Sequence, residues 1–344
     1  MEVVNMSNAG EKFNKILDSL EAEDKRKEDI MSPINSLRVS PDFTFESEDL
    51  GKIRMTEHAF GQLCQQVYNY NLPAEYFKNL FKESPERFAE QLNYHLINGK
   101  ATERKFRTVR DEVGGQSEIR GIVSQSYIPY DNLDALRIFM DTARDLPNYD
   151  LKDVHMDDKM MFLRFIFPET EKNFGRSFDG QDDRNFIALD LINSEVGFTS
   201  IVANPSIYRL ICTNGLVAKQ AEYGFYKQRH MHVDPHKVNE DLRKSIVHGV
   251  ETGKDILHKF EKARQITVEN PYELITDYGK RKAMSEKMLR TVRTNYDIEA
   301  DKSLFGIVNS FTRTARDIKS LERRLEIEKY ASRIMDKELK ARAV

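Results

Sequence analysis

The pattern of the chain changes from strand to helix within one stretch, Gly121-Ile-Val-Ser-Gln-Ser-Tyr-Ile-Pro-Tyr-Asp-Asn132. Before it, strand-like runs at 105–110 and 118–124 flank Gly114-Gly115, a turn signal that predicts a β-hairpin. After it, Asp131-Asn132 opens a run whose apolar residues have helical spacing. The stretch is therefore predicted to join a hairpin to a helix.

A second conspicuous stretch, Arg209-Leu-Ile-Cys-Thr-Asn-Gly-Leu216, follows several strand-like segments. Those segments are 149–156, 159–167, 185–193 and 198–203, with Asn193-Ser-Glu-Val-Gly197 as the hairpin turn between the last two. Asn204-Pro205 is typical of a helix start, so a short helix is predicted over 206–213, ending at Asn214-Gly215. The polar segment 169–184 is predicted to be a mobile loop.

Helical patterns lie on both sides of this strand-rich centre. Residues 1–50 predict an amphipathic helix on a flexible tether, which docks on its own chain or on a neighbouring subunit. Residues 51–235 predict an α+β core, and 236–344 predict a helical C-terminal region. The expected fold is α+β, with a central antiparallel or mixed sheet with hairpins, a helical N-terminal lead-in and a helical C-terminal region.

The net charge of −3 is unevenly distributed over the 344 residues. Residues 219–344 contain 27 Lys and Arg against 20 Asp and Glu, a balance of +7, which leaves −10 for 1–218. A basic half can contact nucleic acid, although helix surfaces often carry many Lys and Arg. Only Cys64 and Cys212 are present, and no apolar run approaches the ~18 residues of a membrane span. With no signal peptide pattern, a cytoplasmic protein without a membrane partner is expected.

Sequence motifs for common catalytic sites are missing. There is no Gly-x-x-x-x-Gly-Lys and no Gly-x-Gly-x-x-Gly, which argues against an ATPase and a Rossmann enzyme. Gly-x-Ser-x-Gly is also absent, which argues against a serine hydrolase. No catalytic residue is predicted, and the chain is not expected to be an enzyme.

Three histidines, His230, His232 and His236, lie within seven residues. On a strand His230 and His232 would share a face and could hold one divalent metal ion. Further ligands would come from Cys212, Asp190 and Asp234. The alternative is that the histidines lie in a loop or pack on basic helices. Apart from this metal, no cofactor is expected.

Basic and aromatic residues on the predicted hairpin form the third candidate site. Arg104, Lys105, Arg107 and Arg120 would hold phosphates, and Tyr127 would stack on a base. The alternative is a solvated charged face over buried aromatic residues. A second basic face contains Lys280, Arg281, Lys282, Lys287, Arg290 and Arg293.

The polar residues of the two stretches also have a structural explanation. Ser124 and Asn132 can cap the turn and the helix after the hairpin. Asn193, Arg209 and Asn214 can form one buried polar network between hairpins. A structural and a functional role remain open for these residues.

The two stretches resemble the blocks of the phage and plasmid-like domain-of-unknown-function 932 family. So do the 193–197 turn, His230, and Leu304-Phe-Gly-Ile-Val-Asn-Ser-Phe-Thr-Arg-Thr-Ala-Arg316, and the resemblance covers roughly 100–335. Its members sit in mobile elements of bacteria, which implies a bacteriophage or plasmid protein in the host bacterial cytoplasm. The family also shows a distant likeness to the single-strand annealing proteins of phage recombination, such as the lambda beta protein. Those proteins bind single strands without ATP and assemble into rings or filaments.

The expected function is ATP-independent binding, and annealing, of single-stranded DNA in phage or plasmid recombination. The expected partners are single-stranded DNA and further copies of the chain. The nucleic-acid contacts would include Arg209 beside the hairpin residues. One alternative is a metal-dependent nuclease that uses His230 and His232, and another is a non-catalytic phage protein that binds and inhibits a host factor.

Overall fold

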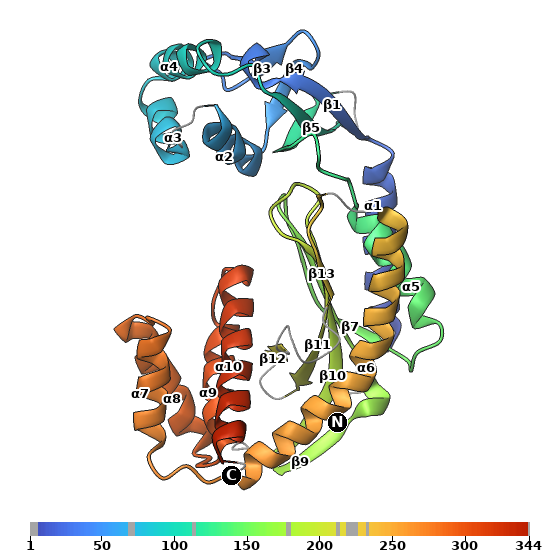
Figure 1. Cartoon of the computed structure of the whole chain (residues 1–344), viewed down its shortest axis with the longest axis vertical. Coiled ribbons are helices and arrows are strands. Elements are labelled where there is room, and N and C mark those ends of the chain that lie inside the picture. Colours follow the sequence, from blue (N-terminus) through green and yellow to red (C-terminus); the bar gives the residue numbers. More distant parts are fainter. Residues whose placement is uncertain are drawn as a thin grey trace.

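The computed structural model describes residues 6–67, 73–111, 115–176, 180–210, 214–217, 226–231 and 234–342. Within these ranges the α+β prediction is confirmed, with helical regions at both ends of the chain. The strands form two mostly antiparallel sheets where one central sheet was expected. Figure 1 shows the first sheet at one end of the long axis, the second in the middle, and the last four helices toward the other end.

The first sheet has the strand order β1-β5-β6-β4-β3-β2. Its strands are β1 (Lys27–Pro33), β2 (Arg38–Val39), β3 (Phe45–Ser47), β4 (Gly51–Met55), β5 (Glu103–Val109) and β6 (Glu118–Val123). The predicted hairpin is β5–β6, with Lys105 opposite Val123. Residues 27–47, expected to be part of a tether, instead form strands, because β1 pairs along the whole of β5 and covers its edge.

Three helices cover this sheet: α2 (Glu57–Gln66), α3 (Ala74–Glu83) and α4 (Pro85–Ile97). The predicted N-cap of α2 is confirmed, since Thr56 Oγ1 accepts a hydrogen bond from the Ala59 amide at 3.1 Å. Phenylalanines form the centre of the core beneath the helices, and Phe43 stacks on Phe88 with ring centroids 5.2 Å apart.

The second sheet has the order β12-β11-β10-β8-β7, with β13 beside β11 and β9 beside β10. Its strands are β7 (Asp150–Met156), β8 (Met161–Ile166), β9 (Lys172–Arg176), β10 (Asp182–Asn193), β11 (Ile201–Arg209), β12 (Asn214–Val217) and β13 (Tyr226–Gln228). Strand β9 lies inside the segment predicted as a loop. The helix predicted after Pro205 is wrong, because β11 continues through that residue.

Pro205 is tolerated within β11 because of where the neighbouring strands pair. It lies opposite Leu189 of β10. On the other side β13 pairs as far as Ala203, and β12 pairs from Ser206 onward. Pro205 therefore lies between the part of β11 that pairs with β13 and the part that pairs with β12. Its missing N–H removes no hydrogen bond from either of these described pairings.

One face of the second sheet is covered by α1 (Met6–Asp24), α5 (Asn132–Ala143) and α6 (Pro235–Gln265). Phe13 of α1 packs edge-on against Tyr149 and Phe165, so the N-terminal helix docks on its own chain. Helix α5 begins with a capping box between Asp131 and Asp134. Figure 1 shows α6 running along the sheet.

Gly253 of α6 lies directly on β10, and a Cβ there would overlap the side chain of Ile187. We expect Gly253→Ala to lower the free energy of unfolding by about 1–3 kcal/mol, because overpacking outweighs the gain in helix propensity. Gly61→Ala in α2 is the matched control, since its Cβ would meet nothing within 4 Å. Equal melting temperatures of the two variants would contradict the close contact.

The opposite face of the second sheet is covered by α10 (Leu321–Arg342), and it combines apolar side chains such as Phe162 and Val202 with a buried ionic cluster. Arg164 donates to Asp190 at 2.6 Å and to Glu328 of α10 at 2.9 Å, and all three side chains are fully buried. The helices that support α10 are α7 (Pro271–Arg281), α8 (Glu286–Glu299) and α9 (Leu304–Arg316). The sheet therefore joins two layers of helices, one by apolar packing and the other partly by buried charge.

Candidate functional site

Glu195, in the β10–β11 turn, is the centre of a buried ionic cluster. Its carboxylate accepts from Lys27 Nζ at 2.7 Å and from Arg120 Nη1 at 2.5 Å. The Asn132 amide at the start of α5 donates to it at 2.8 Å. Burial alone would raise the pKa of Glu195, but Lys27 and Arg120 outweigh burial and lower that pKa to about 2. We call these four residues, with Arg107 and Asp131, the Glu195 hub.

Arg107 is the third cation of the hub, and its side chain is 3% exposed. It pairs with Asp29 at 2.9 Å and Asp131 at 2.8 Å, and it donates to the Glu195 backbone oxygen at 2.5 Å. Burial, and then the charge of Glu195, raises the pKa of Asp131. Arg107 and Arg120, two cations of the predicted hairpin site, are thus neutralised by carboxylates inside the protein.

The first stretch singled out in the sequence, 121–132, meets the 193–197 turn beside the hub. Asn193 Nδ2 donates to the Tyr130 backbone oxygen at 2.9 Å and to Asn132 Oδ1 at 3.0 Å. A Cβ on Gly121 would lie 2.7 Å from Val196 Cβ, so the close approach of turn and strand favours glycine. Asn132 and Asn193 therefore join the hairpin, the helix and the turn. This arrangement fits the structural role that was one of the two alternatives for these residues.

Tyr127 and His230 stack on each other in the same region, with ring centroids 5.1 Å apart and planes 18° apart. Tyr127 is 5% exposed, and its hydroxyl donates to the Ser194 backbone oxygen at 3.0 Å. The predicted role of Tyr127 as a platform for a base is wrong for this conformation, because its ring face is occupied by His230. Burial lowers the pKa of His230 to about 4, so the ring is neutral at pH 7.

Arg209 lies at the other end of β11, away from Asn193. It pairs with Asp183 at 2.7 Å and Glu299 at 2.8 Å and is 6% exposed. The predictions that Arg107, Arg120 and Arg209 hold phosphates therefore do not fit this structure, since internal carboxylates occupy all three. Asn214 of β12 pairs with Arg209 of β11 along the backbone. The side chain of Asn214 lies outside the part of the chain that the structure describes.

Arg104, Lys105 and Ser124 lie nearer the surface. Arg104 donates to Gln66 at 2.5 Å, and Lys105 donates to the Tyr127 backbone oxygen at 2.8 Å. Both side chains remain partly exposed, so their contact with nucleic acid stays a prediction. Ser124 Oγ lies 3.0 Å from Ser126 Oγ within the turn.

The predicted metal ligands are spread over separate environments. His232 and Cys212 lie outside the described residues. Asp190 is held by Arg164, and Asp234 caps α6 by accepting from the His236 amide at 2.9 Å. Within the described ranges, no three His, Cys, Asp or Glu side chains are grouped as metal ligands.

A cationic surface that the sequence only partly indicated lies on α7, α10 and β13. We call Lys227, Arg281, Lys329, Arg333 and Lys337 the basic strip. Arg281 Cζ and Lys337 Nζ lie 5.3 and 5.7 Å from the ring centre of Tyr278. None of the five forms an ion pair with a carboxylate of the described chain. On α10 the signal was periodic, since Tyr330, Arg333 and Lys337 share one helix face.

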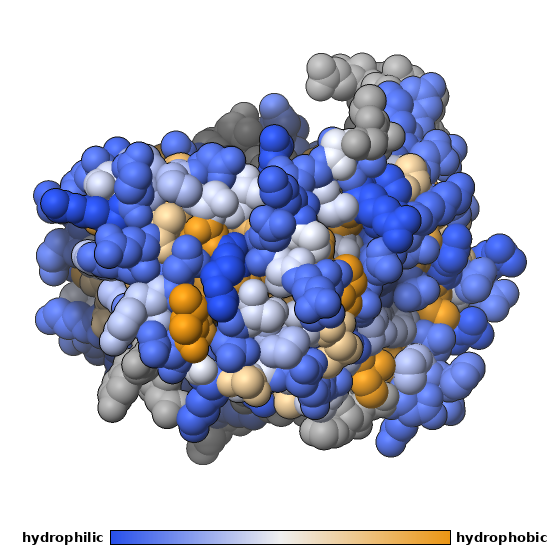
Figure 2. Space-filling model, turned by 90° about the horizontal axis from the view of Figure 1, so that it is seen from above, coloured by the Kyte–Doolittle hydropathy of each residue, from blue (hydrophilic) through white to orange (hydrophobic). Residues whose placement is uncertain are grey.

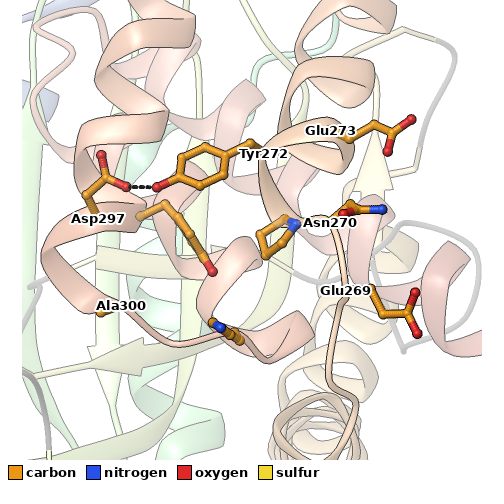
Figure 3. A pocket seen from close by; sticks show the side chains of 9 residues that line it. Glu269, Asn270, Tyr272, Glu273, Asp297 and Ala300 are labelled. Carbon is orange, nitrogen blue, oxygen red and sulfur yellow. Dashed lines mark hydrogen bonds between the residues drawn. The ribbon is translucent and has the colours of Figure 1, made fainter.

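A hollow of about 560 Å³ between α7 and α8 has the opposite charge. Its wall contains Glu269, Glu273 and Asp297, and Tyr272 reaches across to donate to Asp297 at 2.5 Å (Figure 3). The carboxylates outnumber Lys302 in this lining and repel phosphate, so the hollow is disfavoured as a nucleic-acid site.

Two further observations concern the surface and the helices. Seen from above, the molecule is mostly hydrophilic, and its hydrophobic residues are scattered (Figure 2). Across the described ranges, none of the helices combines the length and the apolar character needed to cross a bilayer.

Comparison with known proteins places the chain in one family. The model of the domain of unknown function DUF932 matches residues 120–332, more than half of the chain, and the chain belongs to this family. The match begins in β6 and includes the β10–β11 turn, the second sheet and most of α10. No curated protein and no solved structure matches the chain.

Proposed function

We propose that the chain binds single-stranded DNA on the basic strip and needs no ATP to do so. The observation that carries this proposal is Lys329, a partly buried cation of α10 without an ion-pair partner in the described chain. Burial of an unpaired charge is unfavourable, and a phosphate would supply the missing negative charge.

The surroundings of Lys329 are cationic on two sides. Burial lowers the pKa of Lys329, and the positive charges of Lys227 and Arg333 lower it further. The negative charge of Asp190 opposes this shift. Asp190 is already held by Arg164 at 2.6 Å, as is Glu328 at 2.9 Å. These carboxylates are therefore engaged with another cation, and a polyanion is the natural partner of Lys329.

The strip continues from Lys329 over one surface of the helices. Arg333 follows Lys329 by one helical turn. Burial raises the pKa of the Tyr330 hydroxyl, and the nearby charges of Arg281 and Arg333 oppose that rise. This hydroxyl donates to the Tyr278 backbone oxygen at 2.7 Å. Cations held over tyrosine rings are positioned rather than freely mobile. A row of positioned cations with one recessed member favours a narrow, flexible single strand over a rigid duplex.

The test is fluorescence anisotropy of a labelled oligonucleotide without ATP. We expect Arg281→Ala, Lys329→Ala and Arg333→Ala together to weaken single-strand binding at least about tenfold. The slope of log Kd against log salt should fall by about 2, since each lost phosphate contact removes roughly 0.7 on a single strand.

The matched control removes three exposed cations of the first sheet and its helices, Lys52→Ala, Lys82→Ala and Arg87→Ala. We expect this control to change affinity less than threefold. Absence of single-strand binding by the unmodified chain, equal losses in both triple variants, or tighter binding of duplex would each overturn the proposal.

A further inference from the structure

We infer that a pocket beside the β10–β11 turn receives one planar nucleobase of a bound strand. This inference rests on the proposed function and names the part of the ligand that a second site would take. The pocket has a volume of about 210 Å³ and is lined by Tyr127, Phe198, Ser200, Arg229, His230 and Met231. We call it the turn pocket.

The backbone conformation of the turn keeps an apolar wall of the turn pocket exposed. Phe198 is 39% exposed and Met231 is 43% exposed, and both line the same pocket. Gly197 has a φ of 76°, and the Phe198 amide donates to Ser194 Oγ at 2.9 Å. The turn thus holds Phe198 outward, beside the stacked rings of Tyr127 and His230.

Polar groups in the pocket match the edge of a nucleobase. His230 is 5% exposed, yet its Nε2 has no hydrogen-bond partner in the described chain. The Ser200 hydroxyl also forms no hydrogen bond with a described residue. A base presents donors and acceptors at its edge and an apolar face to stack on, so it would satisfy both the aromatic wall and the unpaired atoms.

The size of the pocket and the cations at its mouth favour a base that is attached to a phosphate chain. A volume of about 210 Å³ is below the ~300 Å³ of common small-molecule sites, so one ring system fits and a whole nucleotide does not. Arg229 is exposed at the mouth, and Lys159 Nζ lies 5.9 Å from the Phe198 ring centre. Arg229 follows Lys227 of the basic strip by two residues, or about 7 Å of extended chain.

The absence of tryptophan from the sequence gives this inference a clean test. Phe198→Trp places a single indole at the pocket, and stacking of a base should quench it. We expect saturable quenching by deoxynucleoside monophosphates and none by deoxyribose 5-phosphate. Tyr94→Trp on α4, where the side chain is 62% exposed, is the control and should show no saturable change.

A second variant tests the unpaired nitrogen. Adding His230→Phe to Phe198→Trp keeps a ring stacked on Tyr127 and removes the imidazole nitrogens. We expect nucleotide affinity to fall roughly tenfold, the effect of one buried hydrogen bond. Unchanged affinity, or tighter binding of N-acetyltyrosinamide than of any nucleotide, would overturn the inference and favour a protein side chain as the ligand.

The outcomes separate the turn pocket from the basic strip. Oligonucleotide binding without any quenching of Phe198→Trp by nucleotides overturns the pocket and leaves the strip. Quenching by nucleotides without oligonucleotide binding overturns the strip. With the strip triple variant in the Phe198→Trp background, quenching by mononucleotides should persist while oligonucleotide affinity falls.

Discussion

Glu195→Gln is expected to lower the free energy of unfolding by about 3–5 kcal/mol, because it leaves buried cations without their carboxylate. Lys27 and Arg120 lie 2.7 and 2.5 Å from this carboxylate, whose side chain is 3% exposed. Denaturant unfolding near pH 7 measures the effect. Glu46→Gln on β3 is the control, since Glu46 is exposed, and it should change stability by less than about 0.5 kcal/mol.

The same prediction has a dependence on pH. The pKa of Glu195 is about 2 in the folded chain and near 4.5 when unfolded. The ionised carboxylate therefore stabilises the fold fully above about pH 4.5, and this contribution is lost as pH falls toward 2. The difference between the unmodified chain and Glu195→Gln should narrow over that window. A difference that stays constant from pH 7 to 3 would contradict the ionic origin of the effect.

Arg164→Met is expected to lower the free energy of unfolding by a similar amount, about 3–5 kcal/mol. The substitution keeps much of the volume but leaves Asp190 and Glu328 buried without their shared cation. Burial already raises the pKa of Glu328, and loss of Arg164 should raise it further. A buried carboxyl group whose pKa is raised in the folded state makes the fold less stable as pH rises. The loss of unfolding free energy caused by Arg164→Met should therefore be larger near pH 8 than near pH 5.

The control for Arg164→Met removes the charges together. Arg164→Met with Asp190→Asn and Glu328→Gln has no buried ion to compensate, so it should recover much of the lost stability. Equal stability of the single and triple variants at every pH would show that the site responds to lost packing and not to unpaired charge.

Local patterns in the sequence predicted local structure well. The β5–β6 hairpin and the Thr56 cap follow from residues close together in the chain, and both are present. The helix after Pro205 was wrong for a physical reason. Whether the missing N–H of that proline matters depends on where β12 and β13 pair, which no local pattern contains.

The candidate site was harder to predict than the fold. The sequence shows that Arg107 is a cation, but its partners Asp29 and the Glu195 backbone lie 78 and 88 residues away. The sequence places Glu195 in a turn, and a carboxylate between two apolar strands is a signal of buried charge. Lys329 was hidden for the opposite reason, since it sits in a helix with many charges and only packing shows which are unpaired.

The Glu195 hub also has a consequence for synthesis of the chain. Lys27 lies in the first strand, and the carboxylate that neutralises it is made 168 residues later. A nascent chain emerging from the ribosome can form β1, β5 and β6 long before the β10–β11 turn exists. Its N-terminal sheet must then carry Lys27 and Arg120 without Glu195 until translation passes that turn, so the final docking of the two sheets is a late event.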